Sequence, residues 1–311
     1  MRGDTGVLLG LALVLLVFGL LIGPQFFRPV NLELMARQTV IVCVAALGMT
    51  MVIVSGGIDL SVGSIVALST VVAALLLRAG IDPALAALGA VGAGALCGAF
   101  NGLLITRLRV VPFIVTLGTM LLVRGAAKGL AEERRIEAPI TWLNDLLRTT
   151  HGVGGSGLGM PAGVWLVGLL AVLVAGLLGY TRFGRHLFAI GSNERTARLC
   201  GVRIDRRKLQ VYTLSAAFAG LAGVLEFSRL AVGDPTVAVG LELDVIAAVI
   251  IGGGSLAGGK GTIVGTVAGA TIMAVIQIGS SQYGLPNWVQ QIVTGVIIVI
   301  AVALDRWRQK G

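Results

Sequence analysis

Residues 6–23 of the chain read GVLLGLALVLLVFGLLIG, a run of 18 residues without a single charge. A helix needs about 20 mainly apolar residues to cross roughly 30 Å of hydrocarbon, so this run is long enough to span a membrane. No small-x-small cleavage site follows it, which favours a retained helix over a removed signal peptide. The fold class then depends on whether such runs recur along the chain.

Apolar runs of similar length recur through all 311 residues. The further candidate spans are 37–55, 61–78, 83–105, 111–130, 162–181, 209–228, 241–256, 262–280 and 287–304. They predict an all-α, polytopic membrane helix bundle of about ten transmembrane helices, with glycine-broken segments at 50–66 and 241–262. We expect a single transmembrane domain covering residues 1–311.

The composition excludes most other classes of protein. Hydrophobic residues make up 56% of the chain and charged residues 13%, whereas soluble proteins carry about 25% charge. A net charge of +9 could indicate a nucleic-acid-binding protein. Aromatic residues make up only 5% of the chain, however, and the basic residues lie in short gaps between apolar runs, which disfavours nucleic-acid binding. The three cysteines lie far apart and form no metal-ligand pattern, so we expect no metal site.

The placement of lysine and arginine predicts the orientation. With the N-terminus inside and the spans alternating, the inside receives fifteen basic residues and the outside seven. This bias places both termini in the cytoplasm. The two long connections are then an extracytoplasmic loop at 131–161 and a cytoplasmic loop at 182–208, and TWLNDLL at 141–147 could form a short amphipathic helix on the outer surface.

The stretch SGGIDLSVGS at 55–64 interrupts an apolar helix with two glycines, an acid and two serines. Asp59 or Ser61 can cap the helix that follows. Irregular backbone at membrane depth requires protein or a water-filled cavity around it, so the stretch is either a tight cytoplasmic turn or a broken helix beside a pathway. Asp59 is accordingly either a cap or a gating carboxylate. The pathway and gating candidates are Gly57, Asp59, Ser61, Asn101, Glu226 and Asp244.

The stretch GGGSLAGGKGT at 252–262 resembles a nucleotide-binding loop only in part. Gly254, Gly259 and Lys260 satisfy G-x-x-x-x-G-K, but Gly261 replaces the magnesium-binding Ser or Thr. The flanking runs have membrane length and leave no room for a βαβ unit. We therefore expect a flexible cytoplasmic turn, and neither a cofactor nor a catalytic pair in this chain.

The cytoplasmic loop contains the signals of one short helix. Asn193 is a good N-cap and Gly201 supplies the stop, which predicts a helix at about 194–200 with Ala197 and Leu199–Cys200 on one face. The segment is either a basic loop held at anionic lipid headgroups or a rigid projection bound by a cytoplasmic partner, and the capped helix favours the projection.

Glycines repeat every four residues at 94, 98 and 102, which predicts close packing between helices.

Three stretches together resemble the membrane permeases of bacterial sugar-importing ABC systems of the ribose, xylose, arabinose and autoinducer-2 type, with ribose permeases closest. They are SGGIDLSVGSIVALS (55–69), GRHLFAIGSNERTARLCGVRID (184–205) and LELDVIAAVIIGGGSLAGGKGTIVGT (241–266). The resemblance implies an inner-membrane subunit that forms the pathway for a monosaccharide. It also implies a second permease subunit in a homodimer, a cytoplasmic ATPase that uses ATP and Mg²⁺, and a periplasmic sugar-binding protein.

The same resemblance implies that the cytoplasmic helix is the coupling helix, which sits in a cleft of the ATPase. Its residues in this sequence are Ser192, Asn193, Glu194, Arg195, Thr196, Ala197, Arg198, Leu199 and Gly201. The main alternative is an ion-coupled secondary transporter of small polar solutes, with Asp59 and Glu226 as ion ligands. A membrane enzyme would need a catalytic pair at one membrane face.

Overall fold

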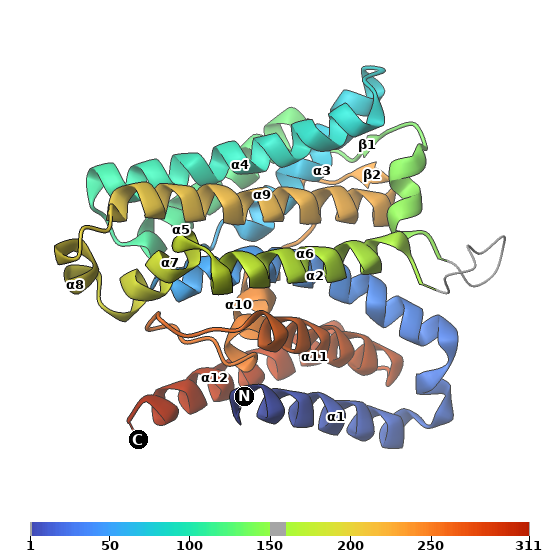
Figure 1. The fold of residues 1–311 in the computed structure, drawn as a ribbon. Helices are drawn as coiled ribbons and strands as arrows, with labels where there is room; N and C mark the ends of the chain where they lie inside the picture. Colours follow the sequence, from blue (N-terminus) through green and yellow to red (C-terminus); the bar gives the residue numbers. More distant parts are fainter. Residues whose placement is uncertain (1, 150–159, 311) are drawn as a thin grey trace.

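The computed structural model describes residues 2–149 and 160–310, which are mostly helical (Figure 1). The α-helices are α1 (Arg2–Ile22), α2 (Pro29–Val54), α3 (Val62–Arg78), α4 (Pro83–Leu108), α5 (Pro112–Leu130), α6 (Ala162–Tyr180), α7 (Arg182–Ser192), α8 (Glu194–Leu199), α9 (Ile204–Leu230), α10 (Leu241–Ile251), α11 (Ile263–Gln282) and α12 (Asn287–Lys310). The remaining elements are the 3₁₀ helices η1 (Pro24–Phe27) and η2 (Trp142–Leu147) and the antiparallel strands β1 (Ile136–Glu137) and β2 (Val232–Gly233).

The all-α membrane fold is confirmed. Within the described residues, seven helices are long and apolar enough to cross a membrane, namely α1, α2, α4, α5, α6, α9 and α11. Every predicted span contains a helix, but the one predicted at 241–256 is shorter than expected. There α10 has 11 residues, a rise of only about 16 Å. Gly253, with φ of 89°, follows directly after its C-cap and turns the chain away, so α10 is too short to cross the hydrocarbon core alone.

Helix α2 forms the centre of the bundle. All residues from Val40 to Val54 are buried, and α2 packs against α6, α9, α10 and α11. A helix that is apolar all round has no face that prefers water, so it is stable only when other helices surround it. The largest hydrophobic cluster of the described chain is built around this segment.

The glycine repeat of α4 brings that helix against α9, as predicted. A Cβ added to Gly94 would lie 2.6 Å from the carbonyl oxygen of Ala216, and one on Gly98 would clash with the carbonyl of Tyr212. Gly269 on α11 meets the carbonyl of Ala248 on α10 in the same way. Small residues let helix backbones approach closely where the hydrophobic effect drives no association between helices.

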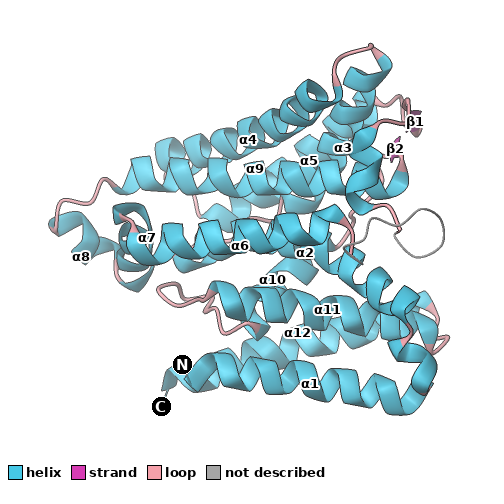
Figure 2. Cartoon of the chain, turned by 45° about the vertical axis from the view of Figure 1, so that its right-hand side comes forward, coloured by secondary structure: helices cyan, strands magenta, loops and turns pink. Residues whose placement is uncertain are grey.

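The bundle has two distinct ends. Helix α8 lies at one end, beyond the ends of α6 and α9, and α1 begins and α12 ends on that same side (Figure 2). The β1–β2 pair and η2 lie at the opposite end. The short amphipathic helix predicted at 141–147 is present as η2, but it packs inward: Leu143 and Leu147 are buried, and the Leu147 N–H donates to Ser228 Oγ of α9 (3.0 Å). Part of the predicted loop, residues 150–159, lies outside the described residues.

The α4–α9 contact yields a matched pair of substitutions. Gly98→Val should lower the free energy of unfolding by about 1–3 kcal/mol, because the new side chain has to displace the α9 backbone. Gly92→Val lies on the same helix with nothing within 4 Å of the added Cβ, so it should have little effect. Thermal unfolding in detergent measures both, and an equal melting temperature for the two variants would contradict the contact.

Candidate functional site

The short helix predicted at about 194–200 is confirmed as α8, and hydrogen bonds fix both of its ends. At the start, Asn193 Oδ1 accepts a hydrogen bond from the Thr196 N–H at 3.0 Å. At the end, Gly201 has φ of 83° and its N–H donates to the Arg198 carbonyl (3.0 Å), while the Val202 N–H donates to that of Ala197 (3.1 Å). This pair of bonds is the Schellman motif, in which glycine adopts the left-handed conformation without a steric cost.

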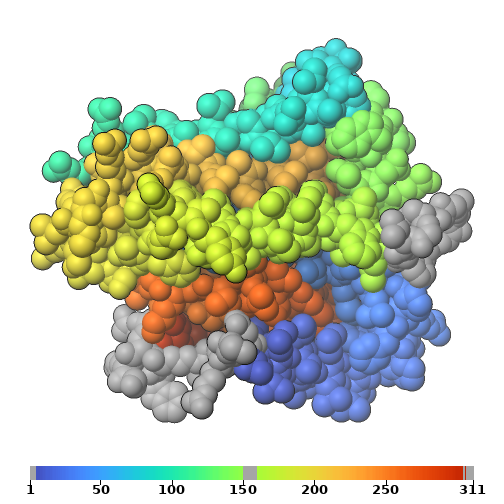
Figure 3. Space-filling model, in the orientation of Figure 1, coloured from blue at the N-terminus to red at the C-terminus, as the bar shows by residue number. Residues whose placement is uncertain are grey.

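The two apolar positions of α8 point in opposite directions, so the prediction of one shared face is wrong. Ala197 is buried against Ile190 and Ile204, whereas Leu199 is 88% exposed. Residues two apart on an α-helix lie about 200° apart around its axis, which separates these side chains. The α7–α8 segment projects at the edge of the molecule (Figure 3). An exposed leucine on a small, fixed projection is suited to a partner's pocket.

An ion pair ties α8 to the start of α9. Lys208 Nζ lies 2.7 Å from Glu194 Oε2, and Arg198 lies 3.4 Å from the other oxygen of Glu194. The Lys208 side chain is mostly buried, so this pair is less exposed to solvent screening than an ordinary surface pair. Helix α8 is therefore held at its N-terminus by Asn193, at its C-terminus by Gly201 and on one side by the Glu194–Lys208 ion pair.

Three segments meet where α2 ends, next to Ser192. The Gly259 N–H donates to the carbonyl of Val54 at 2.9 Å. A Cβ on Gly258 would lie 2.9 Å from the Cα atoms of both Gly191 and Gly56. We call this contact of Val54, Gly56, Gly191, Gly258 and Gly259 the glycine junction. The 252–262 stretch, predicted to be a flexible turn, is instead packed between α2 and α7, because its glycines allow backbone-to-backbone contact.

Within the 55–64 stretch, residues 55–61 break the helix between α2 and α3, and all of them except Gly56 and Ile58 are buried. Asp59 has no exposed surface, and its Oδ1 accepts from the Ser61 N–H (2.9 Å) and Oγ (2.5 Å). Asn101 Nδ2 of α4 donates to Ser61 Oγ at 2.9 Å. Gly57 lies against the ring and hydroxyl of Tyr212 on α9, where a Cβ would not fit. Four of the six pathway candidates are thus gathered in one buried cluster.

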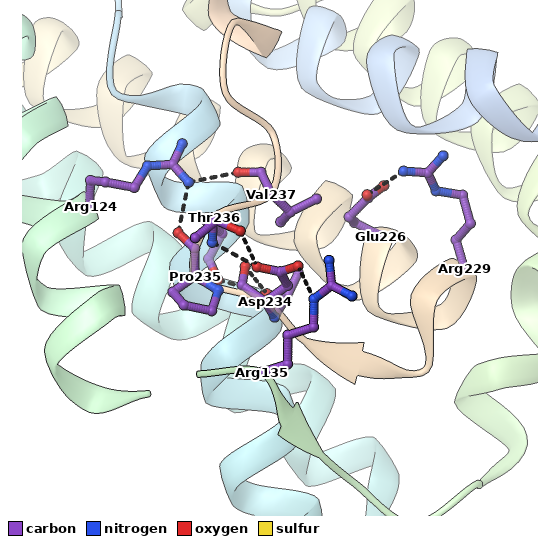
Figure 4. Close-up of polar contacts among 10 residues, drawn as sticks. Arg124, Arg135, Glu226, Arg229, Asp234, Pro235, Thr236 and Val237 are labelled. Carbon is purple, nitrogen blue, oxygen red and sulfur yellow. Dashed lines mark hydrogen bonds and ion pairs between the residues drawn. The ribbon is translucent and has the colours of Figure 1, made fainter. Parts of the chain in front are cut away.

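The other two candidates, Glu226 and Asp244, lie apart from this cluster. Glu226 is buried and pairs with Arg229 of its own helix (Figure 4). Asp244 Oδ2 accepts from Gln277 Nε2 at 2.6 Å. The sequence reasoning missed Gln277, because a single glutamine within an apolar run carries no motif.

A second polar cluster, at the end of the bundle that carries β1 and β2, was also missed. Asp234 Oδ1 accepts from the N–H (2.8 Å) and hydroxyl (2.6 Å) of Thr236, and Asp234 Oδ2 pairs with Arg135 at 2.8 Å (Figure 4). Arg124 of α5 donates to the carbonyls of Pro235 (3.0 Å) and Val237 (2.6 Å). The Asp-Pro-Thr sequence suggests a turn, but nothing in it indicates that Arg124 and Arg135 converge there.

Comparison with known proteins identifies the family. The profile described as "Branched-chain amino acid transport system / permease component" matches residues 31–302. The chain belongs to this family.

The permease has several well-covered relatives. It is 40% identical over 297 residues to the ribose import permease protein RbsC of Escherichia coli K12, covering 96% of this chain and 92% of the relative. It is 41% identical over 305 residues to RbsC of Bacillus subtilis 168 (97% and 92%). It is 36% identical over 308 residues to the fructose import permease protein FrcC of Rhizobium meliloti (97% and 85%). No solved structure matches the chain.

The polar cluster around Asp234 predicts a pH dependence of the permease's stability. Burial raises the pKa of Asp234, but hydrogen bonds from Thr236 and Arg135 outweigh it and hold the pKa below its ordinary value. A carboxyl whose pKa is lowered on folding stabilises the protein above its unfolded pKa of about 3.9, and this contribution disappears as the pH falls through the lowered pKa. Asp234→Asn should therefore lower the melting temperature at pH 7 by a few degrees, corresponding to about 1 kcal/mol.

The difference in melting temperature between the native protein and Asp234→Asn should shrink as the pH is lowered from 5 to 3. Asp145→Asn is the matched control, because Asp145 is exposed and lies 3.4 Å from Arg148, also exposed. It should change the melting temperature little at either pH. A difference for Asp234→Asn that stayed constant down to pH 3 would contradict the assignment.

Proposed function

We propose that this chain is the membrane permease subunit of an ATP-driven, binding-protein-dependent ABC importer for a monosaccharide. Curated relatives named as ribose and fructose import permeases match it over nearly its whole length. The observation that carries the proposal is α8, a helix fixed at both ends and on one flank that presents an exposed Leu199. The chain is a transport subunit of a multi-pass inner-membrane system, and not an enzyme.

The proposed arrangement has α8 and both termini in the cytoplasm, with about ten crossings and a single domain over 1–311. The excess of basic residues on that side supports it, as does the location of α8 with the start of α1 and the end of α12 at one end of the bundle. The partners are a second permease copy, a cytoplasmic ATPase at α8 and a sugar-binding protein at the opposite end. ATP and Mg²⁺ are used by the ATPase, and this chain binds no cofactor.

In this mechanism the residues from Ser192 to Gly201 receive the movement of the ATPase. A rigid α8 moves as a unit with α7, whose Gly191 belongs to the glycine junction and whose Ser192 lies against Gly259. The junction adjoins the buried break, where Gly57, Asp59, Ser61 and Asn101 hold α3 and α4 together. We therefore assign these four residues to positioning the helices during gating. Energy enters because the ATP-bound ATPase has different affinities for the two states of the bundle.

The exposed Leu199 provides the test. Leu199→Glu should abolish co-purification of the ATPase and lower ATP-dependent sugar uptake at least tenfold, because it places a charge in an apolar contact. The fold should be unaffected, because the side chain makes little contact within the subunit. Co-purification in detergent and uptake of radiolabelled D-ribose in proteoliposomes measure the two effects.

Ile140→Glu is the matched control, since Ile140 is 84% exposed near the opposite end. It should leave ATPase binding intact. Full ATPase binding and uptake by Leu199→Glu would contradict the coupling role of α8. Uptake by the unsubstituted protein that collapses with an uncoupler while ATP stays high would instead favour the ion-coupled alternative.

A further inference from the structure

Five polar side chains from four helices form a continuous set of contacts that no sequence motif revealed. Arg229 Nη1 donates to Gln38 Oε1 at 3.0 Å, and Gln38 Nε2 donates to Gln277 Oε1 at 3.3 Å. The chain of contacts continues from Gln277 to Asp244 at 2.6 Å, and from Arg229 to Glu226. We call Gln38, Glu226, Arg229, Asp244 and Gln277 the Gln38–Gln277 network. It joins α2, α9, α10 and α11.

The network lies within helices and is open on one side. Gln38, Asp244 and Gln277 are half-buried, and one third of the Arg229 side chain is exposed. Polar side chains exposed to hydrocarbon carry a large free-energy cost, so those on membrane helices face the bundle interior or a water-filled cavity. The open side of the network therefore faces water rather than lipid.

Charged groups extend this surface toward α5. The carboxylates of Glu242 and Asp244 are close enough to interact electrostatically, and Glu242 in turn attracts Arg124. Arg124 is held in place by two carbonyls of the 234–240 loop. The polar surface thus runs from α5 across α10 and α11 to α2 and α9, and it carries both acidic and basic side chains.

The chemistry of the network matches a sugar. Each glutamine amide donates and accepts hydrogen bonds, the carboxylates accept, and Arg229 donates. A monosaccharide presents neighbouring hydroxyl groups that also donate and accept, so it can replace the contacts between these side chains one for one. The set includes no aromatic ring on which a sugar could stack. Exchange of hydrogen bonds without stacking gives the weak binding that passage requires.

We propose that the Gln38–Gln277 network is a low-affinity site for the hydroxyl groups of a monosaccharide on the translocation pathway. The proposal rests on the importer function proposed above. It assigns Gln38 and Gln277 to contact with the sugar and Asp244 and Glu226 to holding the amides and Arg229 in position.

The first test separates sugar movement from ATP hydrolysis. Gln38→Leu and Gln277→Leu should each lower uptake of radiolabelled D-ribose or D-fructose by about tenfold, the effect of losing one hydrogen bond of about 1.4 kcal/mol. ATP hydrolysis stimulated by the binding protein should remain within twofold. The assay uses the complete complex in proteoliposomes.

Thr39→Val and Thr271→Val are the matched controls on α2 and α11, because each hydroxyl donates only within its own helix, to Met35 and Val267. They should leave uptake unchanged. Unchanged uptake in both glutamine variants would overturn the inference. Uptake by the unsubstituted complex that needs no ATP would overturn the proposed function instead.

A second measurement does not depend on the leucine variants folding normally. In a Cys200→Ser background, which removes the exposed native cysteine, Gln38→Cys should react with a membrane-impermeant maleimide, and 100 mM D-ribose should slow the reaction at least twofold. Val172→Cys on the exposed face of α6 should remain unreactive, because it faces lipid. A Gln38→Cys thiol that is unreactive in every nucleotide state, or that ribose does not protect, would show that the network only joins helices.

Discussion

The hydrogen bond from the Gly259 N–H to the Val54 carbonyl is the contact on which the arrangement of the end of the bundle near α8 depends. Helix α2 is the most buried of the long apolar helices. The residues directly after α2 supply hydrogen bonds to the carbonyls of Met51, Val52 and Ile53, whereas the carbonyl of Val54 bonds to another segment of the chain. A buried carbonyl without a hydrogen bond costs free energy, and the glycines of the 252–262 loop let its backbone come close enough to supply one. This requirement brings the 252–262 loop and the end of α7 to the same place.

The glycine junction lies between two distinct regions of the molecule, the α7–α8 projection and the polar surface around Gln38 and Gln277. At the end of the bundle that carries α8, α7 and α8 form a projection held by Asn193, Gly201 and Lys208. Farther along the bundle, α2 and its neighbouring helices carry the polar surface around Gln38 and Gln277. The projection is joined to α2 through the backbone contacts of the glycine junction. Packed backbones deform little, which suits the transmission of a small movement over a long distance.

The sequence predicts what is local and misses what is distant. Apolar runs located the long helices, and Asn193 with Gly201 set both ends of α8, because capping depends on residues a few positions apart. Helix α7 (Arg182–Ser192) was missed, because it lies in the 182–208 segment, which was predicted to be a loop with one short helix. Helix α10 ends earlier than its apolar run predicted, because its end depends on Gly253 and on contacts with α11. Arg135 and Asp234 are 99 positions apart, and Gln38 and Gln277 are 239 apart. Local sequence patterns carry no information about contacts between residues so far apart, so the polar surface could be recognised only in the folded structure.

The glycine junction also constrains how this chain can diverge. At Gly191 and Gly258 the space for a side chain is occupied by the main chain of another segment, so no neighbouring side chain can shrink to compensate for a substitution. Acceptable replacements would require simultaneous shifts in three segments that lie far apart in the gene. The helix faces that meet solute have no such restriction. Descendants of this chain can therefore exchange one cargo for another while their inner scaffold stays almost fixed.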